Sequence, residues 1–145
     1  SHAENMIETI SDETWLDNLD AYDKISFTAM AKPTINKLVD DIFNKIETAI
    51  TEDFGEYMIS MSAQDVLNKF KSHIKLPLAE LLKEKIIGNP GFDFHTETSA
   101  KTVSFGEAKY GGTTTKYTDA LTQIESFITK EKDKMEFRAI LPFFV

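Results

Sequence analysis

Apolar positions in the first half of the chain recur at intervals of three and four residues, which is the spacing of one helix face. The clearest stripe follows Pro33-Thr34, a predicted helix start, and comprises Ile35, Leu38, Val39, Ile42, Ile46, Ala49 and Ile50. Ser11-Asp12-Glu13-Thr14 predicts an earlier helix start, because polar and acidic residues suit a helix N-terminus. Further stripes predict a helix from Ser62 to Ile74 and another from Pro77 to the turn Gly88-Asn89-Pro90-Gly91. These stripes indicate core packing and imply no chemistry.

Beyond Gly91 the apolar pattern changes from helical spacing to alternation, which is typical of a strand. The segment 92–97 places its two phenylalanines on one face and Asp93, His95 and Glu97 on the other. A turn over 98–101 leads to a second segment, 102–110, that is rich in β-forming residues. The short connection predicts an antiparallel hairpin.

The last part of the chain reads as a helix followed by a strand. After the loop at Gly111-Gly112, a stripe that starts near Thr118-Asp119 predicts a helix, and 137–141 predicts a final strand. The predicted fold class is therefore α+β, with a small mixed sheet flanked by helices. We divide it into an acidic helical N-terminal region, 1–76, and a core, 77–145, whose apolar end predicts continuation into further structure.

Charge and composition narrow the class of protein. The 145 residues carry a net charge of −8, with 13 acidic and 4 basic residues in 1–60 and 11 acidic and 12 basic residues in 61–145. The first part therefore has a net charge of −9 and the second +1, which argues against a general polyanion binder. The sequence contains no cysteine, which excludes disulfides, thiolate zinc sites and cysteine nucleophiles and favours a reducing, cytoplasmic setting. No apolar run is long enough to span a membrane, so we expect no membrane partner.

Candidate chemistry gathers on the predicted hairpin. Glu107 and Lys109 lie on one face of the second strand, and Asp93 joins them if the two strands are neighbours in register. Two carboxylates beside a lysine suit a hard divalent cation, so we expect Mg²⁺, or alternatively Mn²⁺, bound by Asp93, Glu107 and the Ala108 carbonyl. Such an ion serves phosphodiester hydrolysis, with Lys109 orienting the water or stabilising developing negative charge. The alternative is a solvated cross-strand ion pair worth about 0.2–1 kcal/mol.

With these residues, the chain resembles the PD-(D/E)xK nuclease superfamily, whose members are restriction-endonuclease-like. The matching residues are Pro90-Gly91-Phe92-Asp93 and Glu107-Ala108-Lys109, and the resemblance covers about half of the chain, from Leu78 to Leu141. It implies an αβββαβ core, Mg²⁺ dependence, and cleavage of DNA or, less often, RNA. The acidic N-terminal helices match nothing in this core and form an N-terminal helical extension. It departs from the family in the little room it leaves for a strand between Leu82 and Asp93.

The resemblance also implies supporting residues. A helix acid upstream of the aspartate corresponds to Glu80, with Glu84 as second choice, and a glutamine on the helix after the lysine strand corresponds to Gln123. The catalytic set is then Asp93, Glu107, Lys109, Glu80 and Gln123.

Other residues are candidates for substrate contacts only. His95 shares the predicted face of Asp93, while Lys101 and Lys116 flank the site in sequence. The alternative without a function is that His95 is an ordinary hydrogen-bonded residue and that the two lysines are ordinary surface residues. The predicted function is a metal-dependent endonuclease acting in restriction or phage defence. The alternative is a noncatalytic module with a nuclease-like fold that binds a protein partner through its acidic helices. A homo-oligomer is a further possible assembly.

Overall fold

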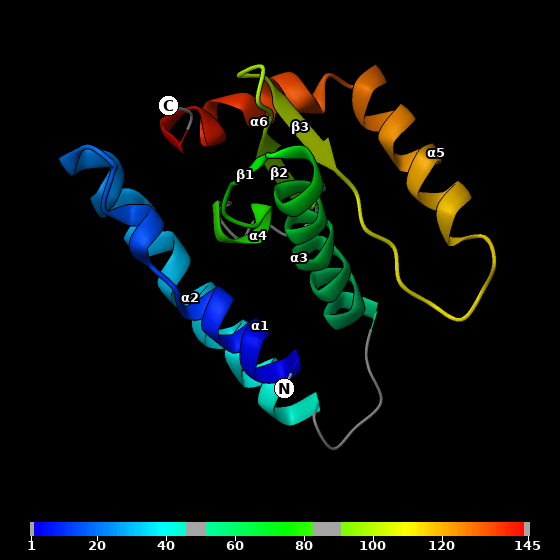
Figure 1. The fold of residues 1–145 in the computed structure, drawn as a ribbon, viewed down its shortest axis with the longest axis horizontal. Coiled ribbons are helices and arrows are strands. Elements are labelled where there is room, and N and C mark those ends of the chain that lie inside the picture. Colours follow the sequence, from blue (N-terminus) through cyan, green and yellow to red (C-terminus); the bar gives the residue numbers. More distant parts are fainter. Residues whose placement is uncertain (1, 46–51, 83–90, 144–145) are drawn as a thin grey trace.

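The computed structural model describes residues 2–45, 52–82 and 91–143. Within these ranges the chain is α+β and mostly helical, with a three-stranded antiparallel sheet (Figure 1). No helix in this described part is long and apolar enough to cross a membrane. In chain order the elements are α1 (His2–Ser11), η1 (Thr14–Leu16), α2 (Ala21–Lys45), α3 (Glu52–Lys71), β1 (Ile74–Lys75), α4 (Ala79–Leu82), β2 (Phe94–Glu97), β3 (Val103–Gly106), α5 (Lys116–Thr129), α6 (Lys132–Ile140) and η2 (Leu141–Phe143).

Helices α1 and α2 form an antiparallel pair along one flank of the molecule (Figure 1). The prediction of a helix start at Ser11 is wrong, because Ser11 is the last residue of α1. Asp12 then accepts hydrogen bonds at Oδ1 from the backbone N–H (2.9 Å) and the hydroxyl (2.7 Å) of Thr14. A short polar side chain that bonds nearby backbone favours a turn over a continued helix, and the short 3₁₀ helix η1 follows.

Helix α2 begins well before the predicted start at Pro33, which instead lies inside it. Asp20 supplies the cap: its Oδ1 accepts the backbone N–H groups of Tyr22 (3.0 Å) and Asp23 (2.9 Å). The predicted stripe is confirmed where it is described, since Ile35 and Leu38 are buried. The stripe residues Ile46, Ala49 and Ile50 lie outside the described residues.

The third predicted helix is displaced toward the N-terminus. Helix α3 covers Glu52–Lys71, and Ser72, with a φ of 56°, ends it in the left-handed region. Ile74, predicted to be helical, starts strand β1 instead. The helix predicted from Pro77 corresponds to the short helix α4, and residues 83–90 lie outside the described part of the chain.

The predicted antiparallel hairpin is confirmed by strands β2 and β3, but both strands are shorter than predicted. Strand β2 begins at Phe94 and β3 ends at Gly106, so Asp93, Glu107 and Lys109 lie just outside the strands that were predicted to carry them.

The register of β2 and β3 pairs Phe94 with Gly106 and Glu97 with Val103, and β1 joins the other edge of β2 to give the order β1-β2-β3. The turn closes through the Thr98 N–H, which donates to the Thr102 carbonyl (2.8 Å). Every pairing described in this sheet is antiparallel, so the mixed sheet of the prediction is wrong for the described residues.

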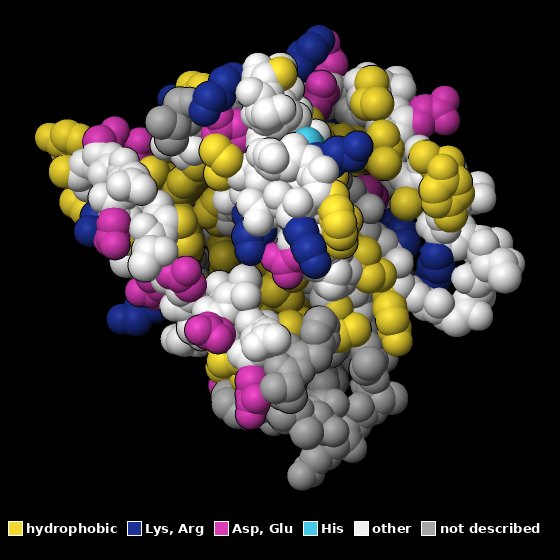
Figure 2. Space-filling view, viewed as in Figure 1, with side chains coloured by type: hydrophobic (Ala, Val, Ile, Leu, Met, Phe, Trp, Pro, Cys, Tyr) yellow, Lys and Arg dark blue, Asp and Glu magenta, His cyan; other side chains and the backbone are white. Residues whose placement is uncertain are grey.

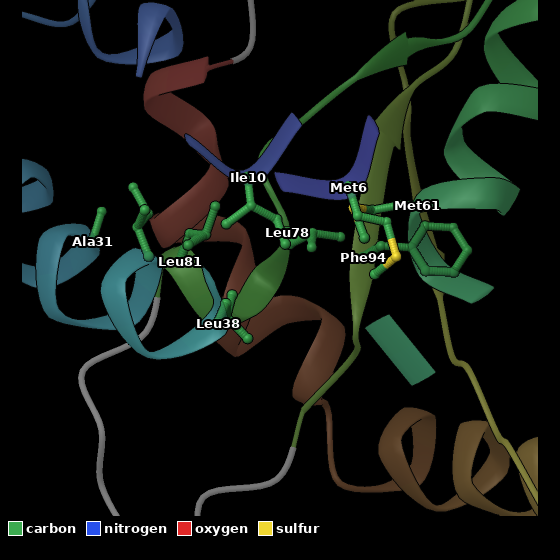
Figure 3. Packing of buried hydrophobic residues seen from close by; sticks show 9 residues of the cluster. Met6, Ile10, Ala31, Leu38, Met61, Leu78, Leu81 and Phe94 are labelled. Carbon is green, nitrogen blue, oxygen red and sulfur yellow. The ribbon is translucent and has the colours of Figure 1, made fainter. Parts of the chain in front are cut away.

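The hydrophobic core joins the helices to one face of the sheet. Its larger cluster takes residues from α1, α2, α3, the segment around α4, and β2: Met6, Ile10, Ala31, Ile35, Leu38, Met61, Leu78, Leu81 and Phe94 (Figure 3). Phe94 approaches Gly106 so closely that an added Cβ would lie 2.1 Å from its ring. Both predicted regions, 1–76 and 77–145, therefore contribute to a shared core.

The final strand predicted over 137–141 is wrong, because these residues belong to α6 and η2. Glu131, with a φ of 56°, separates α5 from α6. Three residues of α6 and η2 that are buried or half-buried are Glu136, Ile140 and Phe143. Their spacing of four and then three residues is that of one helix face. The β-forming composition of 137–141 was therefore overridden by the packing of one helix face.

Candidate active site

Asp93 lies immediately before β2 and is held on both its backbone and its side chain. Its N–H donates to the Gly106 carbonyl (2.9 Å), its carbonyl accepts from the Ala79 N–H (3.1 Å), and its Oδ2 accepts from the Ala108 N–H (2.8 Å). Asp93 directly precedes Phe94, which pairs with Gly106, and Glu107 directly follows Gly106. The two predicted carboxylates therefore come from neighbouring segments.

Glu107 is deeply buried. Its side chain is 1% exposed, and Lys109 Nζ lies 3.1 Å from its Oε1. Burial, and after it the negative charge of Asp93, raise the pKa of Glu107 to about 7, although Lys109 opposes the change. The carboxyl group of Glu107 therefore exchanges a proton near neutral pH.

Lys109 lies between acids from two elements. Its Nζ is 3.9 Å from Glu56 Oε1 on α3 as well as 3.1 Å from Glu107. Burial alone would lower the pKa of Lys109, but the hydrogen bond to Glu107 and the charges of Glu107, Glu56 and Asp93 together raise it. Lys109 is therefore a cation at neutral pH, held beside acidic groups.

These side chains surround a cavity of about 210 Å³. All five members of the predicted catalytic set line it: Asp93, Glu107, Lys109, Glu80 and Gln123. Glu80 comes from α4 and Gln123 from α5, so the cavity is enclosed by helices on more than one side of the sheet end. The structure thus brings together residues that the sequence placed on four separate segments.

Glu56 also lines the cavity, together with its α3 neighbours Tyr57 and Ser60, and the sequence reasoning missed all three. A signal was present in Gly55, because a glycine inside a helix often marks a close approach of another group. The Tyr110 ring lies against Gly55, where an added Cβ would come within 2.0 Å of the ring Cγ. This contact brings the segment after Lys109 to the turn of α3 that carries Glu56.

The three predicted substrate contacts do not line this cavity. His95 is 1% exposed and packs edge-on against Phe105, with ring centroids 5.2 Å apart. Lys101 lies at the hairpin turn, the far end of the hairpin from Asp93, and pairs with Glu97 at 2.9 Å. Lys116, at the start of α5, lies beside Gly111. Glu84, the second choice for the helix acid, is outside the described residues.

His95 is absent from the cavity because the predicted alternation does not extend to Phe92. Phe92 packs against Phe105 and Phe127, with ring centroids 5.1 Å apart in both pairs. Phe94 instead joins the helical core. The two phenylalanines therefore take different sides, because β2 begins only at Phe94 and the preceding residues leave the regular pleat.

The donors at this site fit a hard cation held by few protein ligands. Glu107 Oε2 is buried and has no hydrogen-bond partner among the described residues, so a carboxyl oxygen lacks a counterpart there. Within 2–45, 52–82 and 91–143, no group of three or more His, Cys, Asp or Glu side chains forms a complete ligand set. Mg²⁺ is commonly held by one or two carboxylates, with water and phosphate oxygens completing its shell, which agrees with Asp93 and Glu107.

Comparisons of the chain with protein-family profiles, with curated proteins and with solved structures find no match. The functional argument therefore depends on the geometry of this cavity.

Proposed function

We propose that this chain is a metal-dependent nuclease of the PD-(D/E)xK type that hydrolyses phosphodiester bonds, with DNA as substrate. One observation carries the proposal: Asp93, Glu107 and Lys109 meet at one cavity, and a buried oxygen of Glu107 has no hydrogen-bond partner among the described residues. An exposed ion pair, the alternative interpretation of these residues, would not be expected to bury Glu107 to 1% exposure.

Asp93 and Glu107 would hold a Mg²⁺ or Mn²⁺ ion, with the Ala108 carbonyl as the further predicted ligand. When bound, the ion would neutralise phosphate charge and lower the pKa of the attacking water. The Ala108 N–H already fixes the Asp93 carboxylate, so this ligand is oriented before a cation arrives.

Lys109 would orient the attacking water or stabilise charge that develops on the phosphate. Its ammonium group is charged at neutral pH, and the side chain is 18% exposed and lines the cavity. Glu80 and Gln123 line the same cavity and would support the water and the substrate from α4 and α5.

The order of elements agrees with this class only in part. Between α3 and α5 the described chain runs β1, α4, β2 and β3, so α4 separates the first strand from the other two, whereas the family pattern has three strands in succession. Helix α6 occupies the place of the final predicted strand, which is a departure from the pattern.

Cleavage of supercoiled plasmid in Mg²⁺ or Mn²⁺ tests the proposal. We expect the wild type to nick the plasmid. Lys109→Ala should cleave at least about a hundredfold more slowly, because removal of one contact to the transition state typically has an effect of that size. Lys24→Ala is the matched control, because Lys24 is an exposed lysine that pairs with Asp17 on the N-terminal flank. Equal cleavage by Lys109→Ala and the control would contradict the proposed role of Lys109.

A noncatalytic binding module is the second candidate, favoured by one observation on the acidic flank. Tyr22 and Ile25 are 85% and 69% exposed on α2, close in sequence to the acids Asp17 and Asp20. Absence of cleavage by the wild type on plasmid, single-stranded DNA and RNA with both cations would favour this module over the nuclease.

A further inference from the structure

Helix α6 lies outside the cavity but reaches the residues that bracket Asp93. Glu136 Oε2 accepts a hydrogen bond from the Phe92 N–H at 3.1 Å, and Glu136 Oε1 lies 3.9 Å from His95 Nε2. Phe92 directly precedes Asp93, and His95 follows it by two residues. One carboxylate therefore contacts the chain on both sides of the candidate metal ligand.

The orientation of α6 is unusual for an amphipathic helix. Met135 and Phe137, the apolar neighbours of Glu136, are 66% and 40% exposed, whereas the Glu136 side chain is 11% exposed. An acid at an inward position has an unfavourable desolvation free energy unless it is paired and hydrogen-bonded. A packing role alone would favour an apolar side chain at this position.

The surroundings of Glu136 are aromatic. Phe92 packs on Phe105 and Phe127, and His95 packs edge-on against the same Phe105. The Phe92 N–H therefore lies among apolar rings, where a donor without a hydrogen bond has an unfavourable desolvation free energy. Glu136 satisfies that donor and so fixes the backbone at the residue before Asp93.

We propose that Glu136 is a positioning residue that holds Asp93 in its ligand orientation, which makes α6 a part of the active site. This inference rests on the proposed nuclease function for its catalytic consequence. The contact itself does not depend on that function. Residues that orient a metal ligand typically change metal affinity or activity by about 10–100-fold when they are removed.

Three substitutions separate positioning from folding. Glu136→Gln keeps an acceptor of the same length for the Phe92 N–H. Glu136→Asp keeps the charge but shortens the reach by one methylene, and Glu136→Ala removes both contacts. We expect Glu136→Gln to stay within about threefold of the wild type, and Glu136→Asp and Glu136→Ala to weaken Mn²⁺ binding and kcat by about tenfold or more at unchanged KM for DNA.

Amide hydrogen exchange of Ala108 provides a readout that needs no activity, because its N–H donates to Asp93 Oδ2. It should accelerate by about tenfold in Glu136→Asp and Glu136→Ala, as expected when a hydrogen bond is opened locally. The Thr98 amide, which closes the far end of the hairpin, is the internal control and should be unchanged.

Each outcome decides between the two claims. If Glu136→Asp had the same Ala108 exchange rate and the same Mn²⁺ affinity as the wild type, the positioning role would be overturned. This test holds even where Glu136→Ala fails to fold. Accelerated Ala108 exchange in a protein whose wild type neither binds Mn²⁺ nor cleaves nucleic acid would support the contact but overturn the nuclease.

Discussion

The Tyr110 ring lies against the backbone of Gly55, leaving no space for a Cβ between α3 and the segment that follows Lys109. This contact joins two parts of the cavity wall that are far apart in sequence. Glu56 follows Gly55 on α3, and Lys109 directly precedes Tyr110. The pair therefore connects helix packing to the geometry of the candidate site.

Gly55→Ala should destabilise the protein, because its Cβ would lie 2.0 Å from the Tyr110 ring, which must move. Overpacking of this kind typically costs about 1–3 kcal/mol. Thermal denaturation measures the effect, with Gly112→Ala as the matched control because no atom lies within 4 Å of its added Cβ. A midpoint for Gly55→Ala equal to that of the control would show that Tyr110 does not pack there in solution.

Metal affinity should increase with pH. Cation binding requires an ionised Glu107, whose pKa is raised to about 7 by burial and by Asp93. Because deprotonation of this one group limits binding below neutrality, Mn²⁺ affinity measured by calorimetry should rise about tenfold from pH 6 to pH 8. Glu107→Gln should bind weakly and without this dependence. Equal affinity for the wild type at both pH values would contradict the assignment of Glu107 as a ligand.

Folding stability should show the opposite dependence on pH. The pKa of Glu107 rises from 4.5 to about 7 on folding, so the folded state binds the proton more tightly than the unfolded state. The resulting contribution to stability is complete below about pH 4.5 and is lost as pH rises through about 7. Glu107→Gln should therefore be more stable than the wild type at pH 8, with a smaller difference at pH 5.

Differential scanning calorimetry in chelator measures this difference, and we expect a shift of several degrees at pH 8. Glu125→Gln, on an exposed position of α5, is the control for the change in net charge. A Glu107→Gln variant that loses stability equally at both pH values would show that the buried carboxylate is well satisfied when ionised.

The hairpin and its three chemical side chains could be predicted because they depend on local rules. A short turn makes the neighbouring strand antiparallel. The pairing of Phe94 with Gly106 then brings the residues that flank this pair, Asp93 and Glu107, to the same end of the hairpin, although both lie just outside the strands. Each of these steps involves residues close in sequence.

The contributions of α3 and α6 could not be read in the same way, because they depend on tertiary packing. Glu56 reaches Lys109 only after α3 docks against the segment that carries Tyr110. Residues 137–141 contain good β-formers, but the burial of Ile140 and the inward position of Glu136 select a helix. In this segment the packing of one helix face outweighs the local preference for a strand.

The cavity wall is built from both halves of the chain, so the site depends on their staying together. Glu56 belongs to the N-terminal half of the chain and Gln123 to the C-terminal half, and both border the same space. A proteolytic cut that lets these halves separate would abolish the site while leaving every one of its side chains chemically intact.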